Sequence, residues 1–169
     1  TVLRQCRHVL IPIWAFSIGL GVEELGLIQS ISAALDMTLF YPVGLIMDKF
    51  GRKWTSVPSI ILLSSGFIFM TYVDTFTGLM IVGLLLGFAN GLGSGAMLTL
   101  GSDLSPKKQP GSFLGIWRLF GWSGNSAGGP ISGAVAQTLG NTASALSVST
   151  IGVIGVIIFS FFLPETLKE

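Results

Sequence analysis

Long apolar segments alternate with short polar segments along the whole chain. Six of them approach or exceed the roughly 20 residues that a helix needs to cross a bilayer at 1.5 Å per residue. They cover residues 2–19, 25–47, 54–72, 76–100, 111–139 and 143–163. The first segment is short at its start, as if the chain began inside or just before a helix. The pattern predicts an all-α membrane protein, with one six-transmembrane-helix bundle over residues 1–169.

The connections between these segments alternate in charge. Residues 21–24, 73–75 and 140–142 contain no lysine or arginine, whereas residues 48–53, 102–109 and 164–169 contain six. All the loop cations therefore fall on one side of the bilayer, and basic loops are typical of the cytoplasmic side. We expect both termini in the cytoplasm, and a multi-pass protein of the plasma membrane or a bacterial inner membrane.

The composition agrees with a membrane protein and excludes several other classes. The chain is 50% hydrophobic and only 10% charged, while soluble domains carry about a quarter charged residues. A net charge of +1 without a basic cluster gives no indication of nucleic-acid binding. With one cysteine and one histidine, neither a hydrolytic triad nor a metal cage can be assembled. We expect no enzyme activity, no metal and no cofactor.

Cations lie inside the first apolar segment. Arg4, Arg7 and His8 are three and four residues apart, a spacing that places them on one helix face. If the segment ends near Gly19, Arg7 lies roughly 18 Å below that end. A cation at such depth should face a watery cavity or an acidic partner. The alternative is a basic cluster at the cytoplasmic end of a shortened helix.

The second segment carries a polar stripe on an otherwise apolar helix, made by Gln29, Ser32 and Asp36. Asp36 lies near mid-span, where an isolated carboxylate should be protonated, paired or hydrated. A group that switches among those states is what proton coupling requires. The alternative is a permanent clamp, in which Asp36 pairs with Arg4, Arg7 or Arg118.

Two further helices carry candidate features. In the fourth segment a glycine every four residues predicts close helix packing, and Asn90 lies on a separate polar face. The ladder consists of Gly83, Gly87, Gly91 and Gly95. In the fifth segment Arg118, Trp122 and Asn125 form a second candidate cavity face, and Pro130 among glycines predicts a bend.

The turn between the second and third segments reads Gly44-x-x-x-Asp48-Lys49-x-Gly51-Arg52-Lys53. A glycine at position 51 suits a tight turn, and the three cations suit a cytoplasmic loop. One interpretation is an ordinary basic turn of some polytopic protein. The spacing also resembles the signature loop of the major facilitator superfamily.

Two other stretches are similar to the same family. The segment Gly129-Pro130-Ile131-Ser132-Gly133 resembles the core of an antiporter motif of the fifth helix, although Asn125 stands where the motif has a further glycine. Pro-Glu-Thr at 164–166 resembles the ending after the last helix of many members. The arginine motif of the fourth helix is missing, because Gly83 stands in its place. The resemblance favours the C-terminal half of a twelve-helix fold, although so complete a signature loop is commoner in the N-terminal half.

The resemblance implies roles for the cytoplasmic residues and a function for the chain. Asp48, Arg52 and Asp103 would form a latch that favours one state of the transporter, supported by Gly44, Lys49, Gly51 and Lys53. The implied function is secondary transport of a small organic solute or drug by alternating access, coupled to protons, with antiport favoured. Alternatives are a uniporter or uptake carrier, or a non-transporting scaffold or sensor. The implied partners are the lipid bilayer, the solute, protons and a second six-helix half, either a missing N-terminal half or a second copy.

Overall fold

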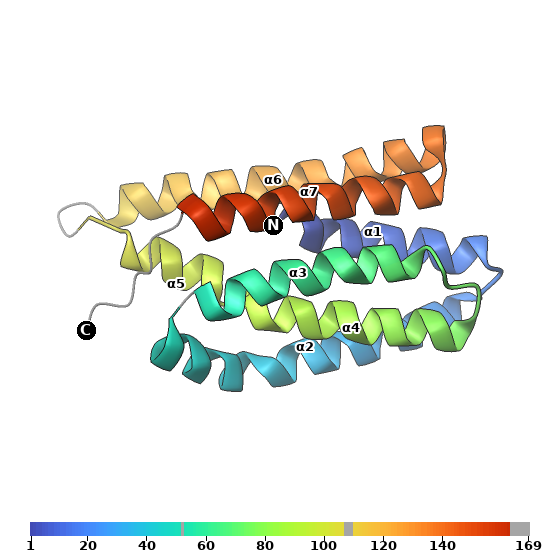
Figure 1. Cartoon of the computed structure of the whole chain (residues 1–169), viewed down its shortest axis with the longest axis horizontal. Helices are drawn as coiled ribbons and strands as arrows, with labels where there is room; N and C mark the ends of the chain where they lie inside the picture. The colour runs from blue at the N-terminus through green and yellow to red at the C-terminus, as the bar shows by residue number, and fades with distance from the viewer. Residues whose placement is uncertain (52, 107–109, 163–169) are drawn as a thin grey trace.

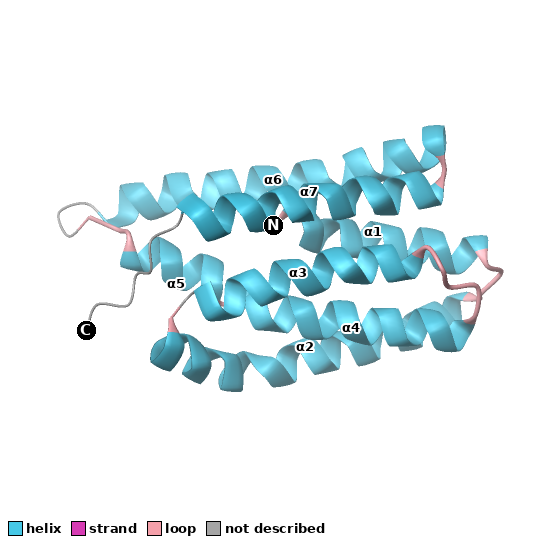
Figure 2. Cartoon of the chain, in the orientation of Figure 1, coloured by secondary structure: helices cyan, strands magenta, loops and turns pink. Residues whose placement is uncertain are grey.

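The computed structural model describes residues 1–51, 53–106 and 110–162, and these residues are almost entirely helical. Figure 2 shows helices joined by short loops. In chain order the helices are α1 (Val2–Ser17), α2 (Val22–Phe50), α3 (Lys53–Met70), α4 (Phe76–Ser94), α5 (Ala96–Asp103), α6 (Pro110–Leu139) and α7 (Asn141–Phe162).

The long helices lie side by side along one axis (Figure 1). The α1–α2, α3–α4 and α6–α7 connections lie at one end of the bundle, and the α2–α3 and α5–α6 connections lie at the other. The main packing pairs are α2 with α4, α3 with α4 and α7, and α1 and α7 with α6. Lys49 and Lys53 therefore lie at one end of the bundle, and Glu23, Glu24 and Asp74 lie at the other.

The α2–α3 connection is shorter than the sequence pattern predicts. Residues 48–50 continue α2 instead of forming a loop, and α3 begins at Lys53. Lys49 in the last turn of α2 interacts favourably with the negative end of the helix dipole. The chain then turns at Gly51, whose φ of 99° is in the region that only glycine adopts readily.

The fourth apolar segment also differs from its prediction as one helix over residues 76–100. It divides at Gly95 into α4 and the eight-residue α5, and the helical structure continues to Asp103. Glycine is a poor helix former and suits such an interruption. Asp103 is therefore the last residue of a helix and not part of the following loop.

Four helical stretches among the described residues are long and apolar enough to cross a membrane. They are Val22–Lys49, Lys53–Met70, Phe76–Asp103 and Asn141–Phe161. The first and fifth predicted spans do not meet these criteria of length and apolarity. Helix α1 has only 16 residues, and α6, although it has 30, mixes apolar residues with glycine, serine, asparagine and arginine. A path through the bilayer for α1 and α6 stays a prediction.

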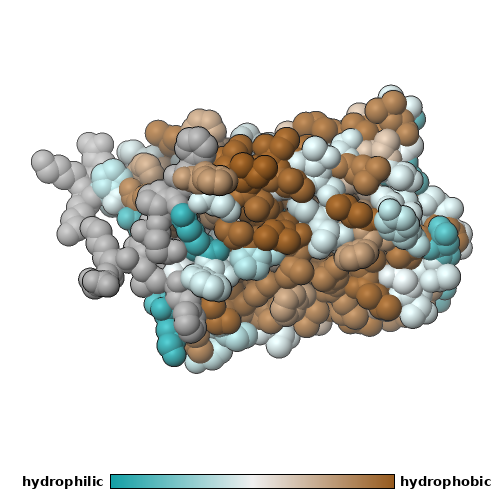
Figure 3. All heavy atoms as spheres, viewed as in Figure 1, coloured by the Kyte–Doolittle hydropathy of each residue, from teal (hydrophilic) through white to brown (hydrophobic). Residues whose placement is uncertain are grey.

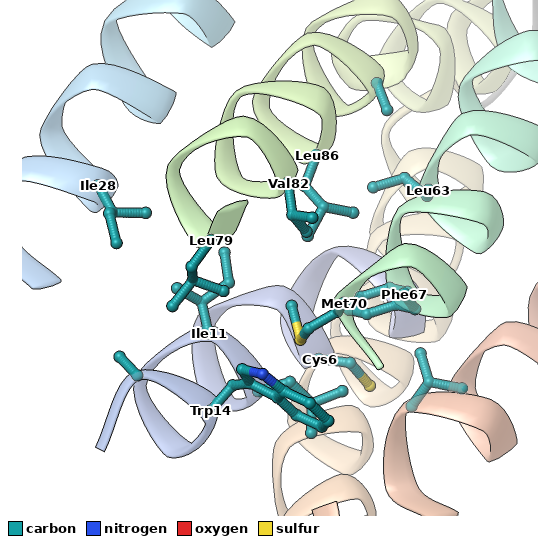
Figure 4. Close-up of a cluster of buried hydrophobic side chains, with 14 residues drawn as sticks. Cys6, Ile11, Trp14, Ile28, Leu63, Phe67, Met70, Leu79, Val82 and Leu86 are labelled. Carbon is teal, nitrogen blue, oxygen red and sulfur yellow. The ribbon is translucent and has the colours of Figure 1, made fainter. Parts of the chain in front are cut away.

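The apolar core joins the first four long helices near the end of the bundle where α1 ends. Figure 4 shows Ile11 and Trp14 of α1 beside Phe67 and Met70 of α3 and Leu79 of α4. The Trp14 indole also donates a hydrogen bond of 2.8 Å to the carbonyl oxygen of Val73. The outer surface is apolar as well: the face in Figure 3 is largely brown at its middle, with hydrophilic residues toward the two ends.

The glycine ladder of α4 faces α2. A methyl group added at Gly83 would meet the Ile28 side chain, and one at Gly87 would lie 2.5 Å from the carbonyl oxygen of Ser32. At Gly91 it would meet Leu39, and at Gly95 the end of Met47. The absence of side chains in α4 thus lets the two helices approach closely along their whole contact, which we call the glycine seam.

Serine hydroxyls link neighbouring helices at four places. Each donates to a main-chain carbonyl oxygen of another helix and is buried in the contact. The bonds run from Ser32 to Gly83 (2.7 Å), from Ser59 to Ala89 (2.6 Å), from Ser144 to Ser132 (2.7 Å) and from Ser149 to Ser64 (3.0 Å). Such bonds add to close packing in an apolar surrounding, where little else draws helices together.

Candidate functional site

A buried ion pair joins α1 to α2. The Arg7 Nη2 atom lies 3.7 Å from Asp36 Oδ2, and Arg7 and Asp36 are only 3% and 9% exposed. The Arg7 Nη1 atom also donates a 3.4 Å hydrogen bond to the carbonyl oxygen of Leu86 in α4. Of the partners that the sequence allows for Asp36, the structure thus shows Arg7.

Asn90 of α4 completes the cluster. Its side-chain amide donates a hydrogen bond of 2.5 Å to Asp36 Oδ2. The carboxylate is therefore held from two helices, by a cation of α1 and an amide of α4. We call Arg7, Asp36 and Asn90 the polar triad. The sequence marks all three residues separately, but only the packing of α1, α2 and α4 brings them together.

The polar triad is incompletely hydrogen-bonded. Arg7 Nε, Asp36 Oδ1 and Asn90 Oδ1 are buried and have no hydrogen-bond partner among the described residues. Buried polar atoms are nearly always paired, because an unpaired one costs about 1–3 kcal/mol. A cluster that tolerates three such atoms is a candidate for binding a further polar group.

The other cations of α1 do not share the environment of Arg7. Arg4 is half-buried, with its guanidinium against Gly93 of α4 and near Ser59 of α3. His8 is exposed, although the charges of Arg7 and Asp36 both act on it. Arg4 and Arg7, three residues apart, still lie on one side of α1, whereas His8 is turned about 100° from Arg7.

The polar stripe of α2 divides in the same way. Ser32 is buried against α4 and donates to the carbonyl oxygen of Gly83, so it links helices instead of lining a cavity. Gln29 is half-buried. Of this stripe, Asp36 alone belongs to the polar triad.

The candidate face of α6 lies apart from the triad. Trp122 is 69% exposed, Arg118 is exposed and Asn125 is half-buried. Helix α6 continues through Pro130 from residue 110 to residue 139, and the main chain of Val2 lies against Gly128. At Gly129 a methyl group would touch Val9, and at Gly133 it would meet open space. The antiporter-like segment thus packs on α1 at Gly129, and its Ser132 is buried.

The exposed surfaces of the bundle differ in chemistry. From Ile151 onward α7 exposes mainly large apolar side chains, such as Ile154, Ile157 and Phe161. Helices α1, α2 and α6 expose polar and charged side chains as well, namely His8, Ser30, Thr38, Tyr41, Arg118, Trp122 and Ser123. We call these seven residues the polar face; the charged and hydroxyl groups among them are solvated better by water or protein than by lipid.

The described residues of the signature loop lie at one end of the bundle. Asp48 and Lys49 form the last turns of α2, and the Lys53 ammonium group donates a 3.4 Å hydrogen bond to the carbonyl oxygen of Ser160 in α7. A methyl group at Gly44 would meet no atom within 4 Å. Arg52 lies outside the described residues, as do Lys107, Lys108 and the Pro-Glu-Thr ending at 164–166. The implied ion pair between Arg52 and Asp103 stays a prediction.

Sequence reasoning missed one feature, a cavity of about 460 Å³ at the start of α1. Its walls come from α1, α3, α4, α5, α6 and α7 and are mostly apolar, with Thr1, Arg4, Ser56 and Ser59 among the polar members. No periodicity in the sequence indicates it, because each helix contributes only a few residues.

The family model described as Major Facilitator Superfamily matches residues 8–169, which is nearly the whole chain. No curated protein matches the sequence.

Proposed function

Because the chain belongs to the major facilitator superfamily, a family of membrane transporters, we propose that it is half of a proton-coupled secondary transporter. The substrate class is a small organic solute or drug, and the expected exchange is antiport, with protons entering as solute leaves. Gly129, Pro130 and Gly133 support antiport through their resemblance to the motif. The membrane is the plasma membrane or a bacterial inner membrane, with both ends of the chain in the cytoplasm.

The observation that carries the proposal is the polar triad. A carboxylate inside a helical bundle is costly unless it is paired, and Asp36 is paired with a single cation on another helix. Protonation of Asp36 would remove that attraction and weaken the contact between α1 and α2. The protonation state of Asp36 would thereby change the relative free energies of two arrangements of the helices. This dependence is what couples proton binding to the conformational change.

The exposed surfaces of the bundle support a second six-helix half as partner. The polar face of α1, α2 and α6 needs water or protein, and a second six-helix half placed there would enclose a cavity between the two. The glycine seam lets helices of one half slide past each other without side chains in the way. Alternating access would then be a rocking of the two halves about a central site.

The decisive experiment replaces Asp36 by asparagine, which keeps the shape of the side chain and resembles its protonated form. Everted vesicles from cells that express the transporter are energised with a pH gradient, and uptake of ethidium is followed by fluorescence. We expect Asp36→Asn to abolish accumulation against the gradient and to spare downhill flux. Ser147→Ala is the control, because Ser147 is exposed on α7 and bonds only to its own helix.

One observation favours a different role for the same residues. The Arg7–Asp36 pair is formed and buried, as a permanent clamp would be, and a transporter with such a clamp could work as a uniporter. Removing one partner of a buried pair costs about 3–5 kcal/mol, whereas removing both costs far less. The double variant Arg7→Gln with Asp36→Asn therefore separates the roles. A clamp in a uniporter predicts that the double variant regains downhill flux and that even the unmodified transporter does not accumulate ethidium, whereas coupling predicts accumulation by the unmodified transporter and restored folding without accumulation in the double variant.

A further inference from the structure

The cavity at the start of α1 has the size and the lining of a ligand site. Its volume of about 460 Å³ lies within the range of about 300–1,000 Å³ that small-molecule sites occupy. Like such sites it is mostly apolar and has few polar groups. No residue of the polar triad or of the polar face lines it. It is therefore separate from the proposed coupling site and from the surface proposed to meet a second half.

Ser56 of α3 lines this cavity with an unsatisfied hydroxyl group. The residue is only 5% exposed, and its Oγ atom is buried without a hydrogen-bond partner among the described residues. An unpaired polar atom in such a surrounding is costly, so it favours a ligand that accepts a hydrogen bond. Ser59, one turn further along α3, differs in this respect, because it donates to the carbonyl oxygen of Ala89.

Arg4 of α1 gives the same cavity a positive charge. A methyl group at Gly93 would meet both Arg4 Nη2 and Ser59 Oγ, so the guanidinium lies beside Ser59. Residues three apart on a helix have Cβ atoms about 5–6 Å apart, which places Ser56 near this group as well. Arg4 forms no ion pair with a described acid, because the carboxylate of the polar triad pairs with another arginine. The cavity therefore holds a half-buried cation and an unpaired hydroxyl.

We propose that this cavity binds an organic anion with an unbranched apolar chain, whose carboxylate contacts Arg4 and Ser56. A guanidinium binds a carboxylate through two parallel hydrogen bonds, and a serine hydroxyl can donate a further one. The apolar side chains of α6 and α7, such as Trp117 and Phe159, would cover the chain. The inference goes beyond the proposed function, since it concerns a second site within one six-helix bundle.

The length of the cavity sets the length of the anion. Its lining residues run from 56 to 63 on α3 and from 151 to 159 on α7, which is about 10–12 Å at 1.5 Å per residue. An extended chain advances about 1.2 Å per bond, so roughly nine or ten bonds fit. Decanoate has this length and is the probe that we choose.

The surroundings favour such an anion over other ligands. A metal cation is repelled by Arg4, and a small inorganic anion leaves the apolar walls uncovered. A neutral chain leaves the charge of Arg4 unbalanced. The apolar surface of α7 borders the cavity, where Ile151 and Ile158 are 42% and 52% exposed. A ligand that dissolves in the bilayer can therefore reach the site from the side of α7.

Equilibrium binding of radiolabelled decanoate to the full chain in lipid nanodiscs tests the proposal, with empty nanodiscs as the measure of partition into lipid. We expect saturable binding, and decanol should compete at least about 10-fold less well, the size expected for a hydrogen bond to a charged group. Arg4→Gln should weaken binding by a similar factor, whereas Arg4→Lys should retain part of the affinity because it keeps the charge. Arg118→Gln is the charge-matched control, because Arg118 is exposed and does not line the cavity.

A second variant tests the location without changing a polar group. Gly155 lines the cavity, and a methyl group there would meet only Ile60, at 4.0 Å. The larger side chain of Gly155→Leu should occupy part of the space and abolish decanoate binding, while Arg4 and Ser56 remain. Circular dichroism confirms that each variant is folded.

The results decide between this site and simpler explanations. Loss of binding in Arg4→Gln and Gly155→Leu, with Arg118→Gln unchanged, supports the proposal. Tight binding by a folded Gly155→Leu overturns the location, and equal competition by decanol overturns the role of Arg4. Equal losses in Arg4→Gln and Arg118→Gln indicate a general attraction of anions to the chain and also overturn the site. Transport is not measured, so these outcomes do not depend on proton coupling.

Discussion

Replacing Gly87 by alanine measures how closely α2 and α4 approach at the glycine seam. The new methyl carbon would lie 2.5 Å from the Ser32 carbonyl oxygen and 2.6 Å from its hydroxyl oxygen. Ordinary carbon–oxygen contacts are about 3.3–3.6 Å, so α2 has to retreat by roughly 1 Å. The obstacle is main chain, which a rotamer change does not remove.

The energy of this change is estimated from three contributions. Overpacking costs about 1–3 kcal/mol, and loss of the Ser32–Gly83 hydrogen bond adds about 1 kcal/mol. The better helix propensity of alanine returns at most about 1 kcal/mol. We therefore expect the free energy of unfolding to fall by about 1–3 kcal/mol.

Reversible unfolding in mixed detergent micelles, followed by circular dichroism, gives this free energy. Gly26→Ala is the matched control in α2, because a methyl group there meets no atom within 4 Å. Equal stabilities of Gly87→Ala and Gly26→Ala would refute the close approach of the two helices.

Three further predictions concern topology, assembly and gating. Single cysteines at Ser105 and Asp74, in a Cys6→Ser background, should react with impermeant reagents from opposite sides of the membrane, with Ser105 cytoplasmic; labelling of both from outside would contradict the six-span bundle. The chain alone should not transport ethidium in liposomes, because its polar face needs a second half, and robust transport by a demonstrated monomer would be inconsistent with that. Asp48→Asn should slow the exchange between states, measured by single-molecule fluorescence, more than it weakens substrate binding; unchanged turnover with a large loss of affinity would show that Asp48 has a different role.

The sequence predicts the helical architecture well, since hydrophobicity and length decide which segments avoid water. It is less exact where a helix ends, as at residues 48–50 and at Gly95. In both places the charge or apolarity of the sequence suggests one helix boundary, and the main-chain geometry sets a different one. Because residues 48–53 are polar, the sequence pattern predicts a loop there and does not reveal that Asp48 still belongs to α2.

The candidate site is only partly predictable for another reason. Polarity within an apolar helix marks Arg7, Asp36 and Asn90 individually, because each is costly in that surrounding. Which of them meet depends on the order and rotation of α1, α2 and α4, which a single sequence does not contain. The same limit explains why Ser32 is predicted to line a cavity, although it links α2 to α4.

The serine links between helices have a consequence for how this fold changes over evolution. In each link only the donor depends on the side chain, because the acceptor is a main-chain carbonyl oxygen, which remains after any substitution. At Ala89, for example, the identity of the side chain matters for size and not for hydrogen bonding. Paired substitutions are therefore not required to keep these contacts, and methods that infer proximity from correlated changes should be nearly blind to them. Apolar residues of these helices can therefore be substituted freely, while the serine hydroxyl of one helix keeps the two helices in the same alignment.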